Sequence, residues 1–108
     1  ISKLSKVPIR FITKVNKTSN VPLYFPIILK NQKIRDNLIL HLKNYNIATS
    51  VHWDPILSNH KLFRKTNNLK LNKAYNLSKT IISLPMHTKL SNKDINYISS
   101  VIINFFNK

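Results

Sequence analysis

Apolar positions recur at helical spacing in two blocks of the chain. Over residues 33–45 and again over 91–106, apolar side chains return every three or four positions, which places them on one face of a helix. Ser91 and Asp94 precede the second block in the spacing of a capping box. A shorter helix is expected near residues 72–79. The pattern therefore predicts two amphipathic helices, each with one face to bury, and one short helix.

Blocks rich in β-branched and aromatic residues predict strands at residues 21–29, 47–52 and 81–84. Pro22 and Pro26 lack an amide hydrogen, so the first of these strands is expected at a sheet edge or as an irregular start. The stretch 8–15 is a further possible strand. The predicted fold class is α+β: a small antiparallel or mixed three-stranded sheet with helices packed on one face.

Local features at the ends of the first helix also carry predictions. Asn46 follows the helix in a chain without glycine, so we expect this asparagine to adopt the positive φ that ends many helices. Arg35 and Asp36 lie near the helix start, where we expect them to pair with each other and with the helix terminus. These roles are structural rather than catalytic.

Two further stretches bear on domain organisation. Residues 56–73 form a polar excursion in which Leu62 and Phe63 are the expected contacts with the body. Residues 1–20 are interpreted as an N-terminal segment, and residues 21–108 as one small α/β domain. A chain of 108 residues is long enough for a single core.

Composition narrows the class of protein. The apolar blocks are too short to cross a bilayer, no signal-peptide core is recognisable near the start, and cysteine is absent. We therefore expect a soluble, cytoplasmic protein. The first residue is isoleucine rather than methionine, so the beginning is interpreted as a cut in a longer chain.

The net charge of +15 is typical of nucleic-acid binders, yet it carries little information here. Lysine, asparagine and isoleucine each occur fifteen times and glutamate is absent, as A/T-rich codon usage would produce. Only three cations are arginine, the residue that makes bidentate base contacts. The lysines are interpreted mainly as a solvated surface, and a small basic RNA-associated protein of ribosomal type remains the alternative.

Candidate chemistry is sparse. The chain contains four histidines, His41, His52, His60 and His87, but no H-x-x-x-H spacing and no cysteine, so a metal site is disfavoured. A nucleophile elbow and a phosphate-binding loop both need glycines that are absent. We predict no catalytic residue in this chain.

The tetrad His52-Trp53-Asp54-Pro55 is the best candidate site. It follows a predicted strand and contains the only tryptophan. A flat aromatic face beside an imidazole suits a ligand with a ring and a phosphate or hydroxyl group. The open alternative is that Trp53 packs into the core and His52 bonds a backbone carbonyl.

The order of the blocks resembles a known family. PLYFPIIL, IRDNLILHLKNYNI, ATSVHWDPI and AYNLSKTIISLPMHTKLSNKDINYISSVI follow one another as in the C-terminal region of DegT/DnrJ/StrS-type PLP-dependent nucleotide-sugar aminotransferases. That family has a strand, an R-D-x-L helix, a strand ending in His-Tyr or His-Trp before proline, and a final helix after an L-P strand end. The resemblance covers residues 22–106, with Asn46 where the family usually has glycine.

The resemblance implies a role within a larger enzyme. These residues would form the small domain of a fold type I PLP enzyme that transfers an amino group, usually from glutamate, to a nucleotide-linked keto-sugar. PLP and its Schiff-base lysine would belong mainly to a large domain of the same chain, with residues 1–20 as the end of the connection. His52 and Trp53 would contact the nucleotide-sugar, Asp54 and Pro55 would shape their loop, and the enzyme would be a homodimer. A stand-alone domain that binds a partner after loss of the catalytic half is a third hypothesis.

Overall fold

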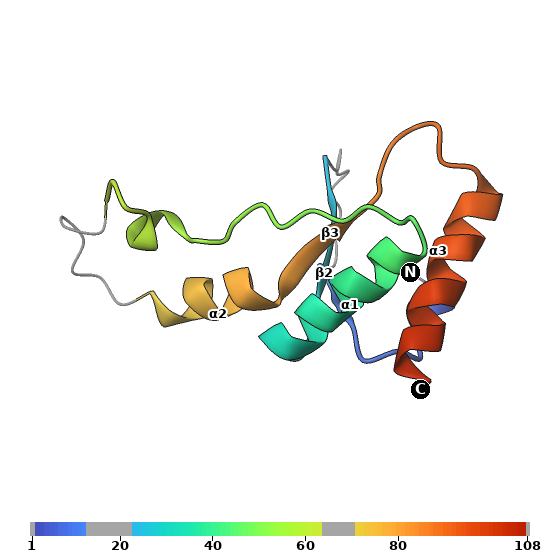
Figure 1. Ribbon diagram of the computed structural model, residues 1–108, viewed down its shortest axis with the longest axis horizontal. Coiled ribbons are helices and arrows are strands. Elements are labelled where there is room, and N and C mark those ends of the chain that lie inside the picture. Colours follow the sequence, from blue (N-terminus) through green and yellow to red (C-terminus); the bar gives the residue numbers. More distant parts are fainter. Residues whose placement is uncertain (1, 13–22, 64–70, 108) are drawn as a thin grey trace, which may run out of the picture.

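The computed structural model describes residues 2–12, 23–63 and 71–107, which form one small sheet, three α-helices and two short 3-10 helices, labelled η (Figure 1). In chain order the elements are η1 (Ser2–Leu4), β1 (Arg10–Phe11), β2 (Phe25–Ile28), α1 (Gln32–Asn44), η2 (Leu57–Asn59), α2 (Asn72–Thr80), β3 (Ile81–Leu84) and α3 (Asn92–Phe106). The strands of the described residues form one antiparallel sheet in the order β1-β2-β3. The predicted α+β class and three-stranded sheet are confirmed.

The core lies between the sheet and the helices α1 and α3, which share one side of the sheet in Figure 1. Its largest fully buried side chains are Ile27, Leu38, Leu42, Ile82 and Ile102. Full burial of one such side chain contributes about 1.5–3 kcal/mol. Leu38 and Leu42 are one helical turn apart, so the predicted apolar face of α1 is the face that is buried.

Pro26 lies in the central strand of the sheet, and the predicted edge position is wrong. Proline is tolerated there because of the register. Ser83, opposite Pro26, directs its backbone N–H and C=O to Ser50 on its other side. Directly opposite residues of an antiparallel pair share their bonding type, so the Pro26 nitrogen points away from β3. On that side β1 ends at Phe11, which pairs with Ile27, so no ladder bond is lost at Pro26.

The strand predicted at 47–52 is also wrong, since only Ser50 pairs with the sheet. It forms an isolated antiparallel bridge to Ser83, with N···O distances of 2.9 and 3.1 Å. Beyond Ser50 the chain leaves β3 toward solvent. The third strand is instead β1, which falls within the stretch 8–15, although residues 13–15 lie outside the described residues.

Helix α1 begins one residue earlier than predicted, at Gln32. The side chain of Asn31 caps it by accepting a hydrogen bond of 2.9 Å from the Ile34 N–H. Asp36 therefore lies beyond the first turn, and its predicted interaction with the helix terminus is wrong. The predicted pairing is confirmed, because Arg35 Nη2 lies 2.8 Å from Asp36 Oδ1.

Two local predictions about helix ends are confirmed. Asn46 has φ 58°, in the left-handed region. At α3, the Asp94 N–H donates to the Ser91 hydroxyl at 3.2 Å, and the Ser91 N–H donates to the Asp94 carboxylate at 2.9 Å. Hydrogen bonds from the Ser91 side chain, and then from its backbone, lower the pKa of Asp94. This arrangement is a complete capping box.

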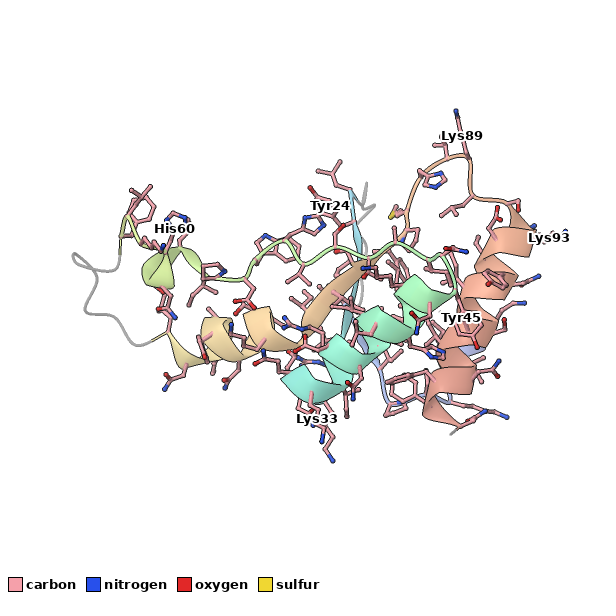
Figure 2. The ribbon with its side chains drawn as sticks, viewed as in Figure 1. Tyr24, Lys33, Tyr45, His60, Lys89 and Lys93 are labelled. Carbon is pink, nitrogen blue, oxygen red and sulfur yellow. The ribbon has the colours of Figure 1, made fainter. Side chains whose placement is uncertain are left out.

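The excursion after residue 55 extends away from the body, so the predicted contacts of Leu62 and Phe63 are wrong. Both side chains are exposed, and His60, near them, lies at the outer end of the molecule in Figure 2. Residues 64–70 of the excursion lie outside the described residues. Its return forms α2, the short helix predicted near 72–79.

In the part of the chain that the structure describes, no helix combines the length and hydropathy needed to span a membrane.

Candidate functional site

The candidate loop comprises residues 50–54, and its start is fixed by backbone hydrogen bonds. Ser50 is bonded to β3 in both directions, at 2.9 and 3.1 Å. Val51, His52 and Trp53 then face solvent. Trp53 is 45% exposed, so the alternative that it packs into the core is wrong.

Three aromatic rings gather at this loop. The rings of Tyr24 and His52 are tilted, with centroids 4.3 Å apart. Trp53 lies 5.3 Å from His52 and meets Tyr24 edge-on at 6.0 Å. We name Tyr24, His52 and Trp53 the aromatic cluster. The side chains of Tyr24 and Trp53 are each 45% exposed. The aromatic cluster therefore presents ring surface to solvent that could contact a planar ligand.

Tyr24 is the residue that sequence reasoning missed. It lies just before β2 and is labelled beside the loop in Figure 2. In the sequence Tyr24 belongs to the apolar block 21–29, which predicts a strand. Its one distinguishing signal is a hydroxyl group among apolar neighbours, which by itself does not place Tyr24 beside His52.

Asp54, directly after the cluster, is held by two cations. Its Oδ1 accepts a hydrogen bond of 2.7 Å from Lys79 Nζ at the end of α2. Its Oδ2 lies 3.6 Å from Arg35 Nη1 at the start of α1. Arg35 is buried, and its guanidinium also donates to the Ser78 carbonyl at 2.9 Å and to Asp36. The Asp54–Pro55 peptide bond is cis.

The other histidines lie elsewhere. His41 Nε2 is 3.2 Å from the Val101 carbonyl, and its ring contacts Phe105. His60 lies at the outer end of the molecule, and His87 lines an apolar hollow beside the start of α3. Within the described ranges, no three potential ligands come together as a metal site.

The described residues do not fit PLP as a complete site. A PLP enzyme needs a lysine amine that can bond to the cofactor and a carboxylate beside the pyridine nitrogen. Asp54 directly follows the aromatic cluster in the chain, and it is already bonded to Lys79 at 2.7 Å. Their charges are therefore already compensated within the fold.

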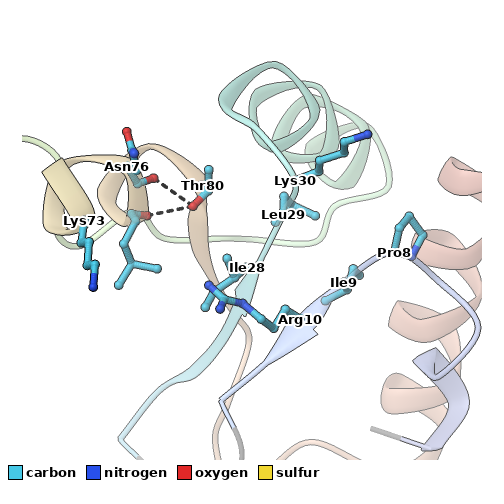
Figure 3. A pocket seen from close by; sticks show the side chains of 10 residues that line it. Pro8, Ile9, Arg10, Ile28, Leu29, Lys30, Lys73, Asn76 and Thr80 are labelled. Atoms are coloured by element: carbon cyan, nitrogen blue, oxygen red, sulfur yellow. Dashed lines mark hydrogen bonds between the residues drawn. The ribbon is translucent and has the colours of Figure 1, made fainter.

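A separate hollow of about 820 Å³ lies between β1, β2 and α2 (Figure 3). Arg10, Lys30 and Lys73 line it, and the Thr80 hydroxyl donates to the backbone carbonyls of Asn76 and Leu77 at 3.0 and 3.2 Å. None of the lining residues belongs to the aromatic cluster. Three surface cations around an open hollow are expected in a chain of net charge +15.

Comparison with known proteins agrees with the order of the elements. The model of the DegT/DnrJ/EryC1/StrS aminotransferase family matches residues 1–103. The dTDP-4-amino-4,6-dideoxy-D-glucose transaminase of Shigella dysenteriae is 29% identical over 82 residues, which are 73% of this chain and 22% of that enzyme. The chain thus spans about a fifth of the length of this curated relative.

Solved structures share the fold. DesV of S. venezuelae superposes with a TM-score of 0.89 at 18% identity, over 99% of this chain and 29% of DesV. Spr1654 of Streptococcus pneumoniae, solved in apo, PMP and PLP forms, superposes in its apo form with a TM-score of 0.84 at 22% identity, over 98% of this chain and 28% of Spr1654. Since the family model spans nearly the whole chain, N-terminal segment included, the chain belongs to the DegT/DnrJ/EryC1/StrS aminotransferase family.

Proposed function

We propose that this chain acts as the small C-terminal domain of a PLP-dependent sugar aminotransferase, which transfers an amino group, usually from glutamate, to a nucleotide-linked keto-sugar. The observation that carries the proposal is the exposed pair His52 and Trp53, which follows the bonded Ser50 in a chain of this family. The substrate class is drawn from the similar transaminase, whose name describes a dTDP-linked amino sugar.

The aromatic cluster supplies the binding groups. The faces of Trp53 and Tyr24 would contact a ring of the ligand, and the His52 imidazole would reach a phosphate or hydroxyl oxygen. PLP, when bound, supplies the electron sink for amino transfer. We assign its binding mainly to a large domain of the same polypeptide, because the described residues do not complete a PLP site. This domain then closes one wall and excludes water, and the enzyme works as a homodimer.

The alternatives receive less support. The family match gives no support to a small RNA-associated protein, whose main argument was the net charge of +15. A stand-alone partner-binding domain would share the fold, yet nothing in the aromatic cluster favours a protein partner over a small ligand.

The test uses the complete polypeptide that contains these residues. Replacing His52 with alanine is expected to raise the KM for the nucleotide-sugar about tenfold or more, the loss of a hydrogen bond to a charged group. The KM for glutamate should change little. His60→Ala is the matched control, because His60 lies far from the aromatic cluster. Equal kinetics for His52→Ala and His60→Ala, or no amino transfer by the wild type, would contradict the proposal.

A further inference from the structure

We propose that Asp54, held between Arg35 and Lys79, fixes the position of His52 and Trp53 without contacting the ligand. We name Arg35, Asp54 and Lys79 the carboxylate clamp. The identity of the ligand, a nucleotide-sugar, rests on the proposed function. The role of the clamp in fixing the loop rests only on the contacts of the described residues.

The loop is anchored at both ends. Ser50 is bonded to Ser83 of β3 in both directions. Asp54 is bonded to Lys79 at 2.7 Å and faces Arg35 at 3.6 Å. Three residues lie between the anchors, and all three are exposed. Two residues of extended chain span at most about 7 Å, so an anchored Asp54 restricts where His52 can lie.

The clamp is well suited to act as an anchor because it is shielded from solvent. The side chains of Arg35, Asp54 and Lys79 are 6%, 18% and 25% exposed, and salt screens such pairs less than surface pairs. Arg35 is held further by the Ser78 carbonyl and by Asp36. Two cations, Arg35 and Lys79, thus face two carboxylates. The carboxylate clamp joins the start of α1, the end of α2 and the loop.

Asp54 is a positioning residue rather than a binding residue. Its Oδ1 accepts from Lys79 and its Oδ2 faces Arg35, so both carboxylate oxygens are engaged within the fold. Its effect on a ligand must pass through His52 and Trp53. A loop already held in its binding conformation loses less freedom when the ligand binds.

The test uses the complete polypeptide, with any tryptophan outside these 108 residues replaced by phenylalanine. Trp53 is the only tryptophan of the 108-residue chain, so the fluorescence of that protein reports on this loop alone. Lys79→Gln is expected to raise the acrylamide quenching constant of Trp53 toward that of free tryptophan. It should weaken binding of dTDP about tenfold, because two ring-bearing side chains must then be ordered on binding. Lys79→Arg keeps the charge and should retain most of both properties. Lys73→Gln, on the same helix but outside the clamp, is the matched control.

Asp54→Asn is the second variant, since Arg35 is buried and its replacement endangers the fold. Retained far-UV circular dichroism in each variant shows that the fold persists. Trp53 quenching that stays at the wild-type value in both Lys79→Gln and Asp54→Asn would overturn the clamp. Absence of dTDP binding in the wild type, together with raised quenching in both variants, would instead contradict the proposed function and leave the clamp supported.

Discussion

Leu38 and Leu40 lie two positions apart on α1 and have opposite surroundings. Leu38 is fully buried, and Leu40 is 60% exposed. Leu38→Ala is expected to lower the free energy of unfolding by about 2–5 kcal/mol, because it leaves a cavity in the core. Leu40→Ala should change this free energy by less than about 0.5 kcal/mol. Urea denaturation of both variants checks the difference, and similar losses would contradict the burial of the predicted face.

The backbone conformation of Asn46 leads to a second prediction at this scale. Its φ of 58° costs an alanine about 1–2 kcal/mol, whereas glycine adopts it freely. We therefore expect Asn46→Ala to lower the melting temperature and Asn46→Gly to preserve or raise it. An alanine variant that melts with the wild type would show that the turn after α1 does not need the left-handed region.

At the residue scale, sequence reasoning was right where the cause is local. The burial of the apolar face of α1 follows from helical spacing, and the φ of Asn46 follows from the absence of glycine. Tyr24 was missed because its partners, His52 and Trp53, come from a segment far along the chain. Asp54 was expected to shape its loop, a role that stays a prediction, and its bond to Lys79 could not be anticipated from spacing.

Among the elements, α3 depends on its capping box. Hydrogen bonds from Ser91 lower the pKa of Asp94 in the folded chain, so the ionised carboxylate stabilises the folded helix. This contribution is complete above the ordinary pKa of aspartate, about 3.9. It is lost as the pH falls through the lowered folded pKa.

An acid titration followed by far-UV circular dichroism checks this pH dependence. The wild type should lose helical signal in strong acid, and Asp94→Asn should remove that contribution. At neutral pH, Ser91→Ala should cost about 0.5–2 kcal/mol, the value of an N-cap. Ser100→Ala, on the exposed side of the same helix, serves as the control. Identical acid titrations of the wild type and Asp94→Asn would contradict the pKa direction.

The strands were predicted less well than the helices. The block at 81–84 became β3, whereas the block at 47–52 contributes only the Ser50 bridge. Short apolar runs do not reveal which neighbour they will pair with. Pro26 illustrates the point: its position in the central strand is allowed only because Ser83 bonds to Ser50 and β1 stops early.

Many large apolar side chains of the described residues are exposed. Leu23, Leu57 and Leu62 are among the exposed large side chains, and the radius of gyration is 15.6 Å against about 13 Å for a compact chain of 100 residues. Exposed apolar patches usually mark a surface for a partner. A large domain of the same polypeptide is the partner that the proposed function provides.

The 108-residue chain alone is therefore expected to self-associate despite its net charge of +15. Size-exclusion chromatography with light scattering across a range of concentrations measures this association. Added salt should increase it, because screening weakens the repulsion between like charges. A chain that remains monomeric at every concentration and melts cooperatively would count against a missing partner surface.

The sequence by itself determined the α+β class, the buried face of α1, the left-handed Asn46 after α1, the capping box of α3 and the family resemblance. Each of these depends on residues a few positions apart, or on their order along the chain. Only the tertiary structure decided which strand is central, which ring joins His52 and Trp53, and what holds Asp54. Those features arise from contacts between segments far apart in the chain, and such contacts depend on register and side-chain packing rather than on local periodicity.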